Sequence, residues 1–159
     1  MRNIILITAI AICAVGCGEK KNEKKESFTI TNHKKEVSTD NKTLQVPIDM
    51  SNKGIGPIHT MTFSEQPDQN MVAAGKAIYQ AKCTTCHMAE RRMIGPALKG
   101  VFNRRSPEWV MNMILNPTEM IKKDPIAKAL LKEYNNAMMQ NQNLTEADAR
   151  NVTEYLRTL

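Results

Sequence analysis

The sequence predicts an all-α fold for residues 68–159, and three observations support this prediction. Apolar residues recur at intervals of three and four in several segments, as expected for helices with one buried face. Two segments open with a polar capping residue followed by proline, which is a common way to begin a helix. Finally, no stretch shows the apolar–polar alternation typical of a half-buried strand.

Four helices are expected in order along the chain. The first covers about residues 69–81, where Val72, Ile78 and Tyr79 form a partly periodic apolar set. The second begins with Ser106 as the N-cap and Pro107 as the first helical residue, and it stops before Asn116-Pro117.

The third helix begins at Asp124-Pro125, which repeats the cap-and-proline start. The last helix follows Thr145, with an acidic residue three positions on at Asp148. The apolar face of this last helix consists of Val152, Tyr155, Leu156 and Leu159.

The N-terminus has the features of an export signal. Arg2 precedes an apolar run from Ile4 to Val15, which is of secretory length but too short to span a membrane. Gly16-Cys17 follows and resembles the lipobox of bacterial lipoproteins, in which the cysteine is lipidated. Residues 1–17 are therefore expected to be a lipoprotein signal, and the mature chain to be exported and anchored to a bacterial membrane, facing the periplasm or the exterior. Ordinary signal cleavage, giving a free soluble product, is the alternative.

Residues 18–67 are rich in Lys, Glu, Asn, Ser and Thr and show almost no apolar periodicity. Such a composition is typical of a solvated, flexible segment. The sequence thus predicts a polar tether over residues 18–67 and one compact domain over residues 68–159.

The five residues from Cys83 to His87 form a C-x-x-C-H motif, which is the attachment site for c-type haem. Each thiol can add to a haem vinyl group, and the adjacent imidazole can bind the iron. A thioredoxin-like pair would need a βαβ setting, a zinc site would need two further ligands, and a disulfide within this motif would close a very small loop. One motif predicts one covalent haem c.

The spacing of further residues around this motif resembles that of the class I c-type cytochromes. The residues that carry this resemblance are Gly75, Tyr79, Cys83, Cys86, His87, Gly95, Pro96, Ala97, Leu98 and Met139. The resemblance spans residues 68–159 and implies a small cytochrome c-like helical domain around the haem. It also implies that the first and last helices cross closely, with Gly75 and Tyr79 against the face that contains Val152 and Tyr155.

In this family the carbonyl of Pro96 would accept a hydrogen bond from His87, and a methionine would be the sixth iron ligand. Met139 has the family's spacing of five residues to Leu144, although Gln140 replaces the usual proline. Met138 remains an alternative axial ligand. Met120 as the ligand and an open iron site are further alternatives. The chain has 11 methionines, and any one of them is more often a core residue than an iron ligand.

Two further features have two interpretations each. The indole N–H of Trp109 is expected either to donate a hydrogen bond to a haem propionate or to belong to a side chain that only packs in the core. Basic residues follow the haem motif in sequence and either neutralise propionates and attract an acidic partner or are simply solvated. These basic residues are Arg91, Arg92, Lys99, Arg104 and Arg105.

These features together predict a monohaem electron carrier rather than an enzyme. Its expected partners are redox proteins, namely a quinol-oxidising complex and a terminal reductase or oxidase. Ligation by a histidine and a thioether favours ferrous iron and leaves no open position on the iron. The alternative is a haem-based sensor or small-ligand-binding protein with an open iron site. Binding to nucleic acid is not expected, since no recognised module is present.

Overall fold

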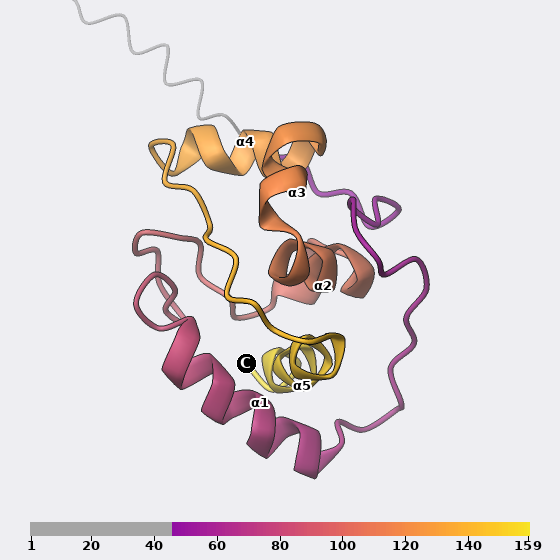
Figure 1. Ribbon diagram of the computed structural model, residues 1–159. Coiled ribbons are helices and arrows are strands. Elements are labelled where there is room, and N and C mark those ends of the chain that lie inside the picture. Colours follow the sequence, from indigo (N-terminus) through magenta and orange to yellow (C-terminus); the bar gives the residue numbers. More distant parts are fainter. Residues whose placement is uncertain (1–45) are drawn as a thin grey trace, which may run out of the picture. The chain divides into compact units, whose positions relative to one another are not determined.

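The computed structural model describes residues 46–159, and within this range the chain folds into helices (Figure 1). The elements in order are α1 (Gln69–Lys82), a 3-10 turn (Val101–Asn103), α2 (Pro107–Leu115), α3 (Pro117–Lys123), α4 (Pro125–Glu133) and α5 (Glu146–Leu156). Long loops follow α1 and α4, whereas α2, α3 and α4 are joined by single residues. The described part contains no named strand, only an isolated bridge between Asp49 and Arg105. The predicted all-α fold is therefore confirmed.

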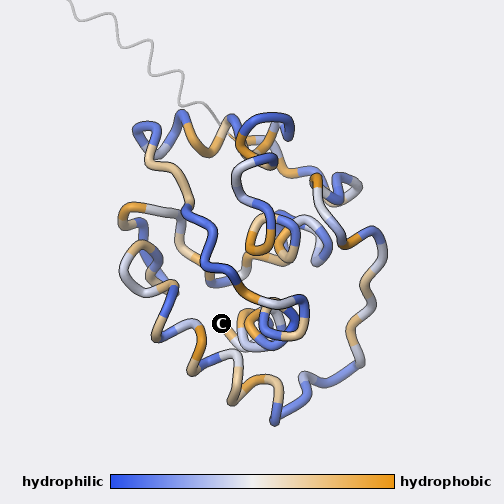
Figure 2. The backbone as a smooth tube through the Cα atoms, viewed as in Figure 1, coloured by the Kyte–Doolittle hydropathy of each residue, from blue (hydrophilic) through white to orange (hydrophobic). Residues whose placement is uncertain are grey.

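Helices α1 and α5 cross at Gly75, as predicted. A Cβ atom on Gly75 would lie 1.9 Å from the backbone oxygen of Asn151, so only glycine allows this approach. One turn further on, the rings of Tyr79 and Tyr155 pack with their centroids 5.2 Å apart. Figure 2 shows hydrophobic and hydrophilic residues alternating along α1, as expected for a helix with one buried face.

The helix starts follow the capping signals in the sequence. Ser106 Oγ accepts the N–H of Trp109, and the Asp124 carboxylate accepts the N–H of Ala127. Thr145 and Asp148 form a reciprocal capping box at the start of α5. Helix α3 is not predicted from the sequence, because a helix of seven residues is too short to show a periodic apolar face.

The compact part of the chain begins earlier than residue 68, which corrects the predicted boundary. Residues 52–61 lie against α2, where the amide of Asn112 donates to the carbonyls of Lys53 and Ile58 and accepts the N–H of Ile58. Asn112 is 1% exposed, so this polar side chain depends on the segment for its hydrogen bonds. We call residues 46–67 the N-terminal strap.

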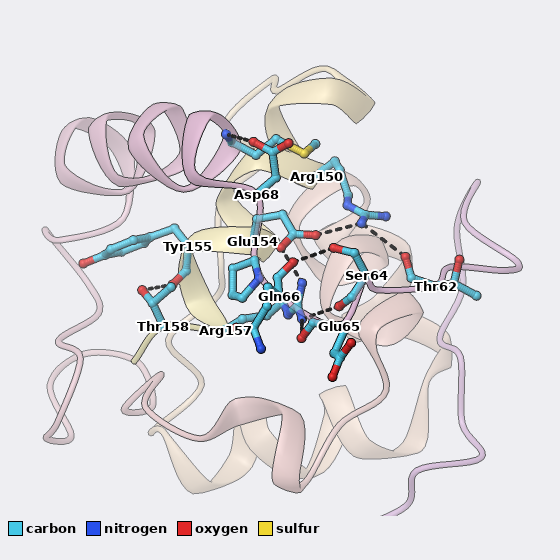
Figure 3. Close-up of polar contacts among 12 residues, drawn as sticks. Thr62, Ser64, Glu65, Gln66, Asp68, Arg150, Glu154, Tyr155, Arg157 and Thr158 are labelled. Carbon is cyan, nitrogen blue, oxygen red and sulfur yellow. Dashed lines mark hydrogen bonds and ion pairs between the residues drawn. The ribbon is translucent and has the colours of Figure 1, made fainter.

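The C-terminal half of the strap is held by α5 (Figure 3). Glu154 is 1% exposed and pairs with Arg150 at 2.7 Å and Arg157 at 2.6 Å. The same two arginines donate to backbone carbonyls of the strap, at Thr62 and Ser64. A buried carboxylate thus orients two cations that bind the strap, and residues 46–67 are part of the domain. Residues 18–45 of the predicted tether lie outside the described residues.

Candidate haem-binding site

The end of α1 forms the turn that carries the C-x-x-C-H motif. The N–H of Cys83 donates to the carbonyl of Tyr79 at 2.9 Å, which ends the helix. The next turn folds back on itself, because the N–H groups of Cys86 and His87 both donate to the carbonyl of Cys83, at 3.1 and 2.8 Å. Both cysteines are free thiols of intermediate exposure. The motif is thus a compact turn with two unpaired thiols next to an imidazole.

Burial, with a smaller contribution from nearby Cys86, raises the pKa of the Cys83 thiol to about 11. Reactive dithiols of the thioredoxin type have lowered thiol pKa values, so Cys83 does not have their character. Among residues 46–159, no three His, Cys, Asp or Glu side chains gather as a metal site either. The geometry therefore fits the haem interpretation of the motif better than the dithiol or zinc alternatives.

His87 is held in one orientation by the loop that follows it. Its Nδ1 lies 3.0 Å from the carbonyl oxygen of Pro96, as predicted. Burial lowers the pKa of His87, and the hydrogen bond to Pro96 only partly offsets this effect. The neutral ring with its proton on Nδ1 leaves the Nε2 lone pair free, which is the form that binds a metal.

Gly95 allows this contact, because a Cβ atom at this position would lie 2.4 Å from Cε1 of His87 and 2.7 Å from its Nδ1. The N–H of Gly95 also donates to the carbonyl of Cys86 at 2.8 Å. The loop backbone is thus closed directly over one face of the imidazole. In the sequence, a glycine followed by a proline indicates only a turn. The structure shows that this turn supports the histidine.

Two residues that the sequence singles out for other reasons also support the histidine loop, and this role was not predicted. The hydroxyl of Tyr79 donates to the carbonyl of His87 at 3.1 Å. The guanidinium of Arg104 donates to the carbonyl of Ala97 at 2.7 Å and to the carbonyls of Lys99 and Gly100 at 3.1 Å each. One arginine that binds three carbonyls fixes the loop in its observed path.

The structure distinguishes between the candidate methionines. Met138 is 63% exposed, whereas Met139 is partly buried and packs against the hydrophobic core. Met120 is fully buried beneath the strap, where its sulfur accepts the N–H of Ile55 at 3.0 Å. Met120 thus packs against the strap and bonds to it. Of Met138 and Met139, only Met139 faces the core.

Trp109 is a core residue rather than a free donor for a propionate. Its side chain is 4% exposed, and its indole N–H donates to the carboxylate of Asp124 at 3.1 Å. The same carboxylate caps α4 and accepts a hydrogen bond from Asn52 of the strap at 2.7 Å. The packing interpretation of Trp109 is therefore the correct one in this structure.

Most of the predicted basic cluster has protein partners. Lys99 pairs with Glu90 at 2.9 Å, and Arg92 pairs with Glu133 at 3.2 Å. Arg104 and Arg105 border a cavity of about 880 Å³ beside Pro96. The cavity is lined by Val46, Pro47, Ile48, Pro96, Ala97, Arg104, Arg105, Leu130, Glu133 and Tyr134. Both guanidinium groups donate to backbone carbonyls, Arg104 to the carbonyl of Ala97 and Arg105 to the carbonyl of Pro47.

The model of the cytochrome c family matches residues 72–159 of the chain. The chain belongs to the cytochrome c family. Members of this family are haem electron carriers, and the cofactor of this cytochrome is accordingly a covalently attached haem c. The free thiols of Cys83 and Cys86 and the oriented imidazole of His87 fit that group.

Solved structures with the same fold include cytochrome c from Rhodothermus marinus, which is 41% identical. The match covers 65% of this chain and 88% of that one, with a TM-score of 0.62. An engineered form of that protein, Rma TDE, is 40% identical, with 65% and 89% of the two chains covered and a TM-score of 0.62. The same engineered form bound to a carbene intermediate is 40% identical, with 65% and 88% covered and a TM-score of 0.60. No curated protein sequence matches the chain significantly.

The predicted signal and lipidation site at Cys17 lie outside the described residues. Within residues 46–159, no helix combines the length and the apolar character that crossing a membrane requires.

Proposed function

We propose that this cytochrome carries single electrons outside the cytoplasm, from a quinol-oxidising membrane complex to a terminal reductase or oxidase. Cys83 and Cys86 would hold the haem through thioether bonds, and His87 and Met139 would bind its iron. The observation that carries this proposal is the oriented imidazole of His87, whose Nδ1 lies 3.0 Å from the Pro96 carbonyl, and the partly buried position of Met139 supports it. When bound, the haem supplies an iron that accepts and returns one electron.

The residues of the chain have distinct tasks in this function. The carbonyl of Pro96 accepts a hydrogen bond from Nδ1–H of His87, which fixes the tautomer and makes Nε2 a better electron-pair donor to a metal. The backbone at Gly95 passes directly against the imidazole and keeps the ring in place. Met139 would give the iron a soft second ligand, which favours the reduced state and excludes small exogenous ligands.

Anchoring by lipid at Cys17 and a polar segment over residues 18–45 belong to the same proposal. A lipidated N-terminus joined to a hydrophilic segment would keep the haem domain near membrane complexes. The sequence of residues 14–17 and the mixed Lys and Glu composition of the following segment support this placement. Mass spectrometry of the membrane fraction tests it, since the mature N-terminal peptide should begin at an acylated Cys17.

Carbon monoxide binding tests whether the iron is closed. The purified haem-loaded protein, reduced at neutral pH, should bind carbon monoxide slowly and weakly, because Met139 must first leave the iron. Rapid and complete binding would instead indicate an open site and favour the sensor or ligand-binding alternative. A reversible one-electron redox titration followed in the same spectra would show that the closed haem still exchanges electrons.

A further inference from the structure

Arg92 joins the loop that holds His87 to the start of the loop that contains Met139. Its guanidinium donates to Glu133 Oε1 at 3.2 Å and also to the backbone carbonyl of Glu133. The same group lies over the ring of Tyr134, 3.9 Å from its centroid. Glu133 is the last residue of α4 and Tyr134 is its C-cap, and Met139 follows five residues later. In Figure 1 the segment that leaves α4 passes the loop that follows α1.

The Met139 loop, residues 134–145, packs Met139 and Leu144 against the core but has few other hydrogen bonds to the rest of the domain. Its first turn closes on α4, with the N–H of Asn136 donating to the carbonyl of Leu131 at 2.8 Å. Asn135 and Asn136 both have positive φ angles, of 56° and 59°, so the chain reverses sharply here. Beyond this turn, two links by side-chain hydrogen bonds leave the loop: the capping box between Thr145 and Asp148 at its end, and a long bond of 3.4 Å from Asn141 to the carbonyl of Leu115.

The charge pair alone is a weak explanation for a fixed loop, because the side chains of Arg92 and Glu133 are 49% and 32% exposed. The three contacts of the planar Arg92 guanidinium restrict the position of the loop more than the ion pair alone does. The guanidinium binds a carboxylate and a helix-terminal carbonyl while it stacks on an aromatic ring. A cation at the C-terminus of α4 is also favoured by the helix dipole. Lysine lacks the planar fork and cannot make these contacts together.

We propose that Arg92 is a positioning residue that keeps the Met139 loop closed, so that the methionine stays on the iron. This proposal rests on the ligand pair in the proposed function. Arg92 itself touches neither ligand: it holds the start of one ligand loop against the other ligand loop. Breaking this link should increase the fraction of time that Met139 is detached, and therefore the affinity of the iron for an added ligand.

Imidazole binding to the ferric haem-loaded protein measures this detachment directly. Arg92→Gln should bind imidazole about 5- to 10-fold more tightly than wild type and should lose part of its methionine-to-iron charge-transfer band. Arg92→Lys should show most of the same effect, because a lysine keeps the charge but cannot make the two hydrogen bonds to Glu133 and stack on the ring of Tyr134 at the same time. Glu133→Gln keeps the carbonyl and the ring and should show a smaller effect.

Lys99→Gln is the matched control, since it breaks the Lys99–Glu90 ion pair of the same loop without touching α4. It should leave imidazole affinity within about twofold of wild type. Equal affinities for wild type and Arg92→Gln, with both proteins fully folded in a urea titration, would overturn the proposal. A wild-type protein that has no methionine-to-iron band and binds imidazole freely would instead refute the ligand pair itself, so the two failures are distinguishable.

Discussion

The Nδ1 atom of His87 lies 3.0 Å from the carbonyl oxygen of Pro96, nine residues further along the chain. This distance depends on Gly95, whose backbone passes so close to the imidazole that any side chain would collide with it. The orientation of the iron ligand is thus set by a backbone acceptor and by a missing Cβ atom rather than by another side chain.

Gly95→Ala should displace the loop and weaken the bond from His87 to Pro96. The imidazole would then donate less electron density to the iron, so the reduction potential should rise by about 60 mV or more, which for one electron corresponds to a tenfold change. Potentiometric titration of the haem-loaded variant measures this shift. Ala97→Gly, in the same loop, is the control and should change the potential much less. A potential equal to that of wild type in Gly95→Ala would show that this bond does not tune the iron.

Gly75→Ala should destabilise the domain by about 3 kcal/mol, near the upper end of the usual cost of overpacking. The added methyl group would lie 1.9 Å from the Asn151 backbone oxygen, so α1 and α5 must move apart. The better helix propensity of alanine offsets only about 1 kcal/mol of this cost. Urea denaturation compares this variant with Lys76→Ala, an exposed neighbour expected to change stability by less than about 0.5 kcal/mol. Equal stabilities of the two variants would contradict the close crossing.

Glu108→Gln should weaken the attachment of the N-terminal strap in a pH-dependent way. The Glu108 carboxylate accepts hydrogen bonds from Lys53 at 3.1 Å and from the N–H of Met61 at 3.2 Å. Burial raises the pKa of Glu108, but its hydrogen bonds and the charge of Lys53 outweigh burial and leave this pKa lowered. The folded state therefore favours the ionised form of the carboxylate.

The stability that this ionised form contributes is present above the ordinary glutamate pKa of about 4.3 and is lost as the pH falls through the lowered value. Wild type should exceed Glu108→Gln by about 1 kcal/mol in free energy of unfolding at neutral pH, because Lys53 is half exposed and screened by water. The two proteins should converge in acid. Glu65→Gln, an exposed strap position, should show no such convergence. A constant difference across the pH range would count against the ionic role of Glu108.

Local signals in the sequence predicted much of this fold because their causes are local. The caps at Ser106, Asp124 and Thr145 act within three residues, and the structure confirms all three. The C-x-x-C-H motif and the Gly95-Pro96 turn likewise lie within one short segment.

Contacts between distant segments could not be predicted in this way. Asn112 and Glu154 are polar residues on helices and suggest a solvated surface, yet each is about 1% exposed. Asn112 binds the strap directly, and Glu154 pairs with two arginines that bind it. The strap itself has a polar composition, and its attachment depends on side chains more than 40 residues away along the chain. The hydrogen bond from Trp109 to Asp124 is of the same kind, since its two partners come from the core of α2 and the cap of α4.

The absorption spectrum of the ferric haem-loaded protein tests the central claim, which is that His87 and Met139 together close the iron. The wild type should show the methionine-to-iron charge-transfer band at the red end of the spectrum. Met139→Ala should abolish this band, and Met138→Ala should leave it intact, because Met138 is 63% exposed and Met139 faces the core. An unchanged band in Met139→Ala, or its loss in Met138→Ala, would contradict this assignment.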